Sequence, residues 1–325
     1  MTGPEGCEHH IIKTNGIHLH CAVAGQGPLV ILLHGFPECW YSWRHQISVL
    51  APHFRVVAPD LRGYGESDKP EGVENYGISS LTADVRGLLE AFGAERAAIV
   101  GHDWGGALAW AFAGSYPRQT ARLVVLNCPH PGVFARHLSK NPRQVLRSWY
   151  MFFFQIPWVP EYVLTVRDHW AVERILRVTA ARADAFRDED IERYKRAAAQ
   201  PGALTAAINY YRAAFRGQQA MALLPTPIRR VAELLTGPTP EPVSGKKIEA
   251  PTLIIWGEDD PFLGKELTQD MESWFAAPFE IKYVPRRGHW IQQEEPRLVN
   301  QYLLGFLGDL CNLPAQHVEH IGTTY

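Results

Sequence analysis

The stretch AAIVGHDWGG, residues 97–106, decides the fold of this chain. Its apolar first half has the pattern of a buried strand, and the small residues after Asp103 begin a helical pattern. A strand that turns sharply into a helix exposes a nucleophilic serine in the motif G-x-S-x-G, and here Asp103 takes that position. An isolated Asp before a helix is usually an N-cap. Because Gly101, Gly105 and Gly106 leave the room that a tight turn requires, the sequence predicts a nucleophilic Asp103 instead.

Strand and helix patterns alternate on both sides of this turn. Such alternation predicts an α/β fold with a mostly parallel, twisted sheet and helices on both faces. After an opening hairpin, the expected strands cover residues 29–33, 53–59, 97–101, 122–127, 252–256 and 279–284. A last helix is expected from residue 295 to about 310.

The strand pattern stops between residues 136 and 217, where we expect only helices, and a Pro-rich loop follows at 225–242. Two independent domains are one interpretation. Because strands resume after the loop, a helical insertion within a single α/β core is the better one. The expected division is a first core part at 1–134, an all-helical cap at 135–246 and a second core part at 247–325.

The composition limits the class of protein and its partners. The chain of 325 residues is 46% hydrophobic, and 32 Lys and Arg against 34 Asp and Glu give a net charge of −2. Because the basic residues are dispersed, we expect a small-molecule partner, and neither nucleic acid nor an anionic membrane surface. The five cysteines are scattered and odd in number, which fits a reducing compartment.

No segment has the pattern of a targeting or membrane-spanning sequence. Residues 1–10 lack the apolar core of a signal peptide. The most apolar run, residues 149–154, is far shorter than the about 20 residues that span a bilayer. We therefore expect a cytoplasmic protein without an integral membrane segment, either a monomer or a homodimer.

The partners of an elbow nucleophile are expected downstream, in the order acid and then histidine. The acids Glu258, Asp259 and Asp260 follow one buried strand, and His289 follows the next. The chain has 14 histidines, but only a histidine in such a post-strand loop completes the ordered series. We choose Asp260 because the pattern W-G-x-x-D places the orienting acid fifth. Its role would be to hold the imidazole of His289 in the right tautomer.

An oxyanion hole requires backbone N–H groups near the nucleophile. One is expected from Trp104, the residue after Asp103. The other is expected from the loop after the strand at 29–33, where the sequence favours Phe36. His34 and Glu38 in the same loop are expected to shape it without taking part in the chemistry.

An aspartate at the elbow changes the bond that the site can cleave. A serine that attacked an sp³ carbon would form an ether, which an oxyanion hole cannot help to hydrolyse. A carboxylate forms an ester whose carbonyl belongs to the enzyme, so water activated by His289 can attack it. Asp103 therefore predicts displacement at an alkyl carbon, with epoxides and alkyl halides as the obvious substrates.

The leaving group separates these two substrates. A departing halide needs N–H donors and no proton, whereas an epoxide oxygen has to be protonated by an O–H donor. Within the expected cap, tyrosines occur at Tyr150 and at the pair Tyr210-Tyr211. Because an aromatic residue can equally pack in the cap core, chemistry alone only suggests a pair of tyrosine donors.

At this point the chain resembles the α/β-hydrolase-fold epoxide hydrolases over nearly its whole length. The resemblance is carried by the motifs HGFPE (34–38), RGYGES (62–67), GHDWGG (101–106), WGEDD (256–260) and GHW (288–290). The stretch 34–70 is particularly similar to the soluble epoxide hydrolases. The Asp-Trp pair at the elbow is shared with haloalkane dehalogenases, whereas HGFPE together with the cap tyrosines is not.

The resemblance implies an α/β-hydrolase fold and hydrolysis of an epoxide to a vicinal diol through an ester on Asp103. It implies that Tyr150, ahead of a Phe-Gln pair, and Tyr211, ahead of an Arg, bind and protonate the epoxide oxygen. Tyr210 fits that role less well. Members of this family need no metal or organic cofactor, so none is expected. The catalytic positions follow the family pattern, and the insertion outside the tyrosine segments is only loosely similar.

Two other functions are alternatives. A haloalkane dehalogenase would use the same Asp103, Asp260 and His289. A small-molecule binding protein would have kept the fold without turnover, which the complete triad disfavours. Substrate contacts are expected from an apolar set of residues: Phe36, Trp104, Met151, Phe152 and Phe153. Detoxification and lipid metabolism both fit such a cavity.

Overall fold

The computed structural model describes residues 6–216 and 247–312, which are organised around one eight-stranded sheet. The strand order is β1-β2-β4-β3-β5-β6-β7-β8, and all neighbours from β4 to β8 are parallel. The strands are β1 (Glu8–Thr14), β2 (Ile17–Ala24), β3 (Leu29–Leu33), β4 (Arg55–Pro59), β5 (Ala97–His102), β6 (Thr120–Leu126), β7 (Thr252–Gly257) and β8 (Phe279–Val284). The mostly parallel sheet expected from the sequence is confirmed.

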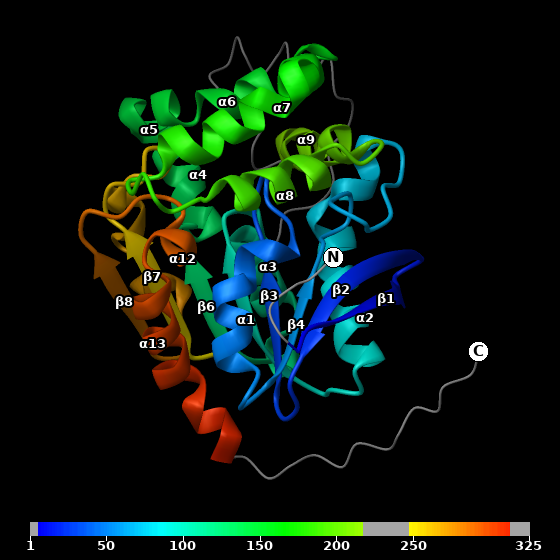
Figure 1. The fold of residues 1–325 in the computed structure, drawn as a ribbon. Helices are drawn as coiled ribbons and strands as arrows, with labels where there is room; N and C mark the ends of the chain where they lie inside the picture. Colours follow the sequence, from blue (N-terminus) through cyan, green and yellow to red (C-terminus); the bar gives the residue numbers. More distant parts are fainter. Residues whose placement is uncertain (1–5, 217–246, 313–325) are drawn as a thin grey trace.

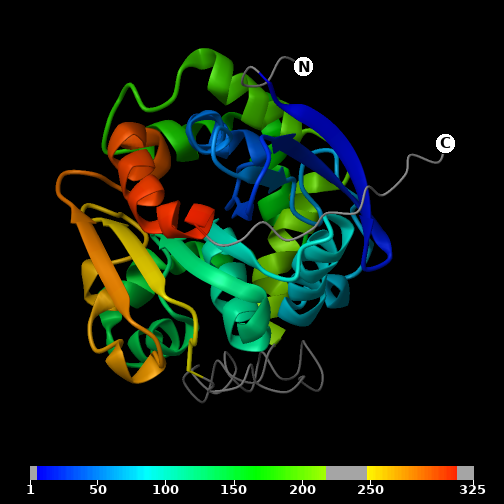
Figure 2. The same cartoon turned by 90° about the horizontal axis from the view of Figure 1, so that it is seen from below.

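Helices cover both faces of the sheet (Figures 1 and 2). The sheet grows in one direction from β3 to β4 and in the other from β4 to β6, so right-handed crossovers place α1 opposite α2 and α3. The contacts agree, because α1 packs on α13 and α2 packs on α3. The core helices are α1 (Arg44–Leu50), α2 (Ile78–Ala91), α3 (Trp104–Ser115), α12 (Ile291–Glu294) and α13 (Pro296–Leu307).

Short 3₁₀ turns connect several of these elements. They are η1 (Trp40–Trp43), η2 (Val73–Tyr76), η3 (Pro117–Gln119), η4 (Lys265–Thr268), η5 (Glu272–Trp274) and η6 (Gly308–Asn312). The central strands β3, β5 and β7 are buried at every residue, as their continuous apolar runs predicted. β1 lies at the edge of the sheet and is mostly exposed.

The chain between β6 and β7 contains helices and no strand in its described part, and Figure 1 shows the helices gathered at one end of the sheet. We call these the cap helices: α4 (Pro131–Lys140), α5 (Pro142–Arg147), α6 (Trp149–Phe153), α7 (Val159–Thr179), α8 (Asp188–Ala198) and α9 (Ala203–Arg216). α7 is broken at residues 166–169, where the backbone is not helical. The domain boundaries at 134/135 and 246/247 stay predictions, and the loop at 225–242 lies outside the described residues.

Buried polar contacts fasten the cap helices to the core. On α8, Asp190 forms an ion pair with Arg44 of α1 at 3.1 Å and accepts a hydrogen bond from the hydroxyl of Tyr41 at 3.0 Å. On α9, the hydroxyl of Tyr210 donates to the backbone carbonyl of Arg62 at 2.7 Å. Each of these contacts joins segments that are far apart in the sequence, so they set the position of the cap helices over the sheet.

A buried ion pair inside the core makes the first testable prediction. Arg62 donates two hydrogen bonds to the carboxylate of Asp84, at 2.6 and 2.7 Å, and both side chains are buried. Replacing Arg62 with Met leaves the carboxylate buried without its cation, so the free energy of unfolding should fall by about 3–5 kcal/mol. Urea unfolding measures this loss. The control is Arg86→Met, which removes an exposed pair with Glu90 and should cost less than about 1 kcal/mol; equal losses would contradict the prediction.

Candidate active site

Asp103 lies in a strained turn between β5 and α3. Its φ of 53° and ψ of −120° are outside the region that non-glycine residues ordinarily adopt. The surrounding glycines are required sterically. A Cβ at Gly101 would lie 2.1 Å from the carbonyl oxygen of Gly105, and a Cβ at Gly105 would lie 2.0 Å from that of Leu33. The sharp turn from strand to helix that the sequence predicts is therefore present.

The loop after β3 holds one oxygen of the Asp103 carboxylate. The backbone N–H of Phe36 donates to Oδ1 of Asp103 at 2.8 Å. The loop can approach this closely only because residue 35 is a glycine, since a Cβ at Gly35 would lie 2.4 Å from the Cβ of Asp103. The second expected donor, the N–H of Trp104, is the first of α3 and has no acceptor within the helix.

His34 and Glu38 shape this loop from within the core. Nε2 of His34 accepts a hydrogen bond from the N–H of Leu61 at 3.0 Å, and Glu38 accepts one from the N–H of Gly35 at 3.3 Å. Glu38 also lies 3.0 Å from Nδ1 of His102, whose Nε2 lies 2.8 Å from the carbonyl oxygen of His289. This buried chain of contacts joins the loop after β3 to the loop after β8.

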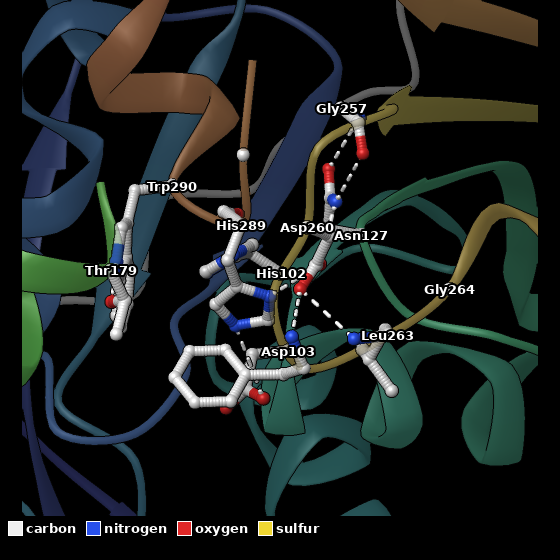
Figure 3. A network of polar contacts seen from close by, with 12 residues as sticks. His102, Asp103, Asn127, Thr179, Gly257, Asp260, Leu263, Gly264, His289 and Trp290 are labelled. Atoms are coloured by element: carbon white, nitrogen blue, oxygen red, sulfur yellow. Dashed lines mark hydrogen bonds and ion pairs between the residues drawn. The ribbon is translucent and has the colours of Figure 1, made fainter. Parts of the chain in front are cut away.

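His289 lies between two carboxylates, as Figure 3 shows. Its Nε2 is 3.6 Å from Oδ2 of Asp103, and its Nδ1 is 2.8 Å from Oδ2 of Asp260. The three residues follow β5, β7 and β8, so the carboxyl ends of parallel strands bring them to one edge of the sheet. The structure thus brings together the three side chains that the sequence chose.

Four donors hold the carboxylate of Asp260 in place. Its Oδ1 accepts hydrogen bonds from the N–H groups of Phe262 and Leu263 at 2.8 and 3.0 Å, and its Oδ2 contacts His289 and the amide of Asn127. The neighbouring acids lie elsewhere, because Glu258 pairs with Lys265 and Asp259 is exposed. Of the three acids in this loop, only Asp260 reaches the histidine.

The two carboxylates determine the charge of His289. Burial by itself lowers the pKa of the imidazole, but the charges of Asp260 and Asp103 outweigh burial and raise it to about 10. For Asp103, burial by itself raises the pKa of the carboxyl group. The adjacent His289 outweighs burial, with help from His102 and the N–H of Phe36, so the pKa of Asp103 is lowered from its ordinary value. In the free protein at neutral pH, a carboxylate therefore faces an imidazolium.

Tyr150 on α6 and Tyr211 on α9 lie over the loops that carry the triad. Their ring centroids are 5.9 Å apart. The ring of Tyr211 contacts those of Phe36 and Trp104, with centroids 5.6 and 5.0 Å away. The ring of Tyr150 lies 5.5 Å from that of Phe262, which in turn contacts His289. Both tyrosines therefore reach the same end of the sheet as Asp103.

Burial raises the pKa of both tyrosine hydroxyls well above the usual value of 10, and the negative charge of Asp103 raises it further. Tyr150 and Tyr211 thus keep their protons at neutral pH and can donate them. The indole of Trp104 opposes this rise in the pKa of Tyr211, but it is the smallest of the effects. Tyr210 turns its hydroxyl to the carbonyl of Arg62 instead, which agrees with its weaker fit to the predicted role.

Asn127 is a polar residue of this site that the sequence patterns did not single out. It follows β6 in a left-handed conformation with φ of 41°, and its amide donates to Oδ2 of Asp260 at 2.8 Å. It also exchanges hydrogen bonds with the backbone of Gly257. A polar residue directly after a buried strand was the available signal, because the carboxyl ends of such strands meet at the site.

The aromatic residues around the site are not all the ones that the sequence predicted as substrate contacts. Phe154, which was not among them, contacts Phe36 and Tyr211 with ring centroids 5.3 and 4.7 Å away. Phe152 packs on Phe215 of α9. Met151 and Phe153 lie on α6 beside Tyr150, and their contact with a substrate stays a prediction.

Within residues 6–216 and 247–312, no group of three or more His, Cys, Asp or Glu side chains could hold a metal ion. In the same residues, no helix is long and apolar enough to cross a membrane.

A parallel sheet with a strained elbow, an acid and a histidine on successive strand ends defines an α/β hydrolase. The sequence model of the alpha/beta hydrolase fold family matches residues 28–296. A crystal structure of the epoxide hydrolase of Bacillus megaterium with an inhibitor has a TM-score of 0.81, is 31% identical and covers 92% of this chain and 100% of that one.

Curated relatives agree with this match. An AB hydrolase superfamily protein of Bacillus subtilis is 40% identical, and the match covers 93% of this chain and 99% of the relative. Epoxide hydrolase 4 of Homo sapiens is 35% identical, with 91% of this chain and 77% of the relative covered. The chain therefore belongs to the alpha/beta hydrolase fold family and, within it, to the epoxide hydrolases. The resemblance carried by its motifs is confirmed.

Proposed function

We propose that this protein hydrolyses an epoxide to a vicinal diol through a covalent ester on Asp103. One observation carries the proposal. Oδ1 of Asp103 is held by the N–H of Phe36, whereas Oδ2 faces Nε2 of His289 at 3.6 Å. The two oxygens of one carboxylate are thereby assigned to different tasks.

In the first step, Oδ2 of Asp103 attacks a carbon of the epoxide ring. A new C–O bond forms, the ring C–O bond breaks, and the released oxygen takes a proton from Tyr150 or Tyr211. Both hydroxyls are protonated at neutral pH, since burial raises their pKa. The product of this step is an alkyl ester that carries a neighbouring hydroxyl group.

In the second step, His289 removes a proton from water, and the water oxygen attacks Cγ of Asp103. Negative charge develops on Oδ1, which the N–H groups of Phe36 and Trp104 stabilise. The bond between Cγ and Oδ2 breaks, and the imidazolium of His289 returns its proton to the departing diol. The remaining proton of the water restores the tyrosine hydroxyl, so protons balance over the cycle.

Ester formation itself prepares His289 for the second step. In the free protein, the charges of both carboxylates raise the pKa of His289 to about 10, which makes it a poor base. The ester removes the charge of Asp103, while burial continues to lower the pKa. His289 then loses its proton to bulk water more readily, and it takes a proton up again once the diol has left and the charge of Asp103 is restored. Asp260 keeps the ring oriented throughout.

This coupling predicts two different pH midpoints. In the free protein, His289 should stay protonated up to a pH of about 10, which an NMR titration of its ring measures. Ester hydrolysis in a single turnover, followed by rapid quench, should become fast at a clearly lower pH. Identical midpoints for the free protein and for ester hydrolysis would contradict the coupling.

The same shift has a consequence for stability. Because the folded pKa of His289 lies above its ordinary value of 6.5, protonation stabilises the fold fully below about pH 6.5, and this contribution is lost as the pH rises toward about 10.

A haloalkane dehalogenase is the alternative, since it would use the same Asp103, Asp260 and His289. The tyrosine pair favours an epoxide, because a halide leaves without a proton whereas an epoxide oxygen needs one. Assays for diol formation and for halide release from matched substrates separate the two functions. Halide release without diol formation would overturn the proposal.

Apolar substrates suit the surroundings of Asp103. We assign substrate contacts to Phe36 and Trp104 beside the nucleophile and to Met151 and Phe153 on α6. A hydrolysis screen of terminal, trans-disubstituted and fatty-acid epoxides measures which shape is preferred.

A further inference from the structure

Exposed large hydrophobic side chains of the described chain are concentrated where α7 begins. Of the eleven large hydrophobic side chains that are exposed in residues 6–216 and 247–312, seven lie between positions 146 and 163. Five of these form what we call the Trp158 patch: Ile156, Trp158, Val159, Tyr162 and Val163. Trp158 is 83% exposed and Tyr162 is 69% exposed. Such a concentration of apolar residues marks an interaction surface.

The patch has the geometry of one helix face. Val159, Tyr162 and Val163 are spaced at i, i+3 and i+4 on the first turns of α7, so their side chains lie on one face. Pro160 and Leu164, at the other positions of these turns, are buried. This half of α7 therefore has two apolar faces, one against the protein and one toward solvent.

Two further exposed residues extend the patch toward α6. The ring of Trp149 packs on Phe153 with centroids 6.0 Å apart, and the carbonyl of Phe153 accepts a hydrogen bond from the N–H of Ile156. Leu146 at the end of α5 is exposed as well. Trp149 is the neighbour of Tyr150, so one short helix contributes to both the exposed surface and the candidate active site.

The charges of the segment that carries the patch are predominantly positive. Residues 131–175 contain six Arg and Lys and three acids. Each acid already has a cation: Glu161 pairs with Arg212, Asp168 with Lys195 and Glu173 with Arg177.

Several basic side chains of this segment, unlike its acids, have no side-chain partner of opposite charge among the described residues. In the part of the chain that the structure describes, Lys140, Arg143 and Arg167 have no side-chain partner, and all three are exposed. Arg143 lies one turn before Leu146 on α5, so a free cation and an exposed apolar residue share one face. The cap surface thus combines Trp, Tyr and aliphatic side chains with unneutralised positive charge.

We propose that the Trp158 patch and the unpaired cations of the same segment dock the cap helices onto the surface of an anionic lipid bilayer. Trp and Tyr favour the boundary between headgroups and hydrocarbon, and nearby Lys and Arg are attracted to anionic lipids. A second copy of the chain is a weaker occupant, because a two-fold contact through this face would bring like charges together. Docking would place α6 next to a phase in which apolar epoxides accumulate.

Vesicle sedimentation of the full chain tests the proposal. The protein should bind vesicles of phosphatidylglycerol and phosphatidylcholine, and bind phosphatidylcholine alone much less. Added salt should weaken binding. Arg143→Glu changes the charge by two units and should weaken binding by about 25-fold, since each charge near the surface is worth about fivefold. The double variant Trp158→Ala, Tyr162→Ala should weaken it by at least about tenfold.

The controls are exposed residues away from the cap helices. Arg96→Glu, before β5, and Ile11→Ala, on β1, match the charge reversal and the apolar truncation, and neither should change vesicle binding by more than about twofold. Unchanged thermal midpoints show that the variants are folded. Equal loss in control and patch variants would overturn the proposal, as would absence of binding to anionic vesicles. So would a dimer, seen by light scattering, that the Trp158→Ala, Tyr162→Ala variant dissociates.

Discussion

Replacing His289 with Gln is expected to stop the reaction after its first step. The variant keeps Asp103, Phe36 and the tyrosines, so it should still be alkylated by a styrene-type epoxide. Without the base, hydrolysis of the ester should slow by about 10²–10⁴-fold. Intact-mass spectrometry should then show the protein mass increased by one epoxide, and peptide mapping should place the adduct on Asp103.

Two variants control this experiment. His53→Gln replaces an exposed histidine and should show parent turnover with no adduct. Asp103→Ala in the His289→Gln background should give no adduct when it is treated with the same epoxide under the same conditions. If the folded His289→Gln protein stayed at its own mass with epoxides that the parent hydrolyses, a covalent route through Asp103 would be wrong.

The double variant Tyr150→Phe, Tyr211→Phe is expected to lose the first step. Phenylalanine keeps the aromatic contacts but cannot protonate the epoxide oxygen, so alkylation of Asp103 should slow by about 10²–10⁴-fold. Rapid mixing with excess enzyme measures alkylation directly. Because the ester forms so slowly, far less adduct should accumulate in the same time even when His289 is also replaced.

Tyr210→Phe is a closely matched control, since it removes a buried hydroxyl one residue away. That hydroxyl donates to the carbonyl of Arg62, so its loss should cost about 1 kcal/mol of stability and leave alkylation within a few-fold of the parent. Parent-like alkylation in the double variant would show that Tyr150 and Tyr211 are not the proton donors.

The elbow and its partners could be predicted from the sequence because they depend on local patterns and on one topological rule. Glycines around Asp103 signal a tight turn, and polar residues that follow strands of a parallel sheet meet at one edge. The choice of Asp260 over Asp259 required a motif, since both follow β7. The structure supplies the reason, which is that Asp260 is buried and faces His289.

Other contacts depend on how distant segments pack, and sequence spacing does not contain that information. Asn127 reaches Asp260 only because β6 and β7 are neighbours in the sheet, although 133 positions separate the two residues. Phe154 contacts the site because α6 ends beside α9. The sequence pattern predicted contacts from Met151 and Phe153 instead.

The charge of the cap surface was also hidden from the sequence. A balanced composition with dispersed Lys and Arg argued against an anionic membrane as a partner. The fold changes this balance locally, because Arg212 and Lys195 from α9 and α8 neutralise acids of α7. The cations left without partners are the basis of the proposed membrane contact.

The ties between the cap helices and the core limit how a substrate can enter. To swing the cap away as one rigid body, the protein would have to separate Asp190 from Arg44 and Tyr41, and Tyr210 from Arg62. Each of these contacts costs about 1–3 kcal/mol to break. These contacts therefore oppose an opening motion of the cap helices as one body. The side chains between the cap helices and Asp103, more than any opening motion, should decide which epoxides are admitted.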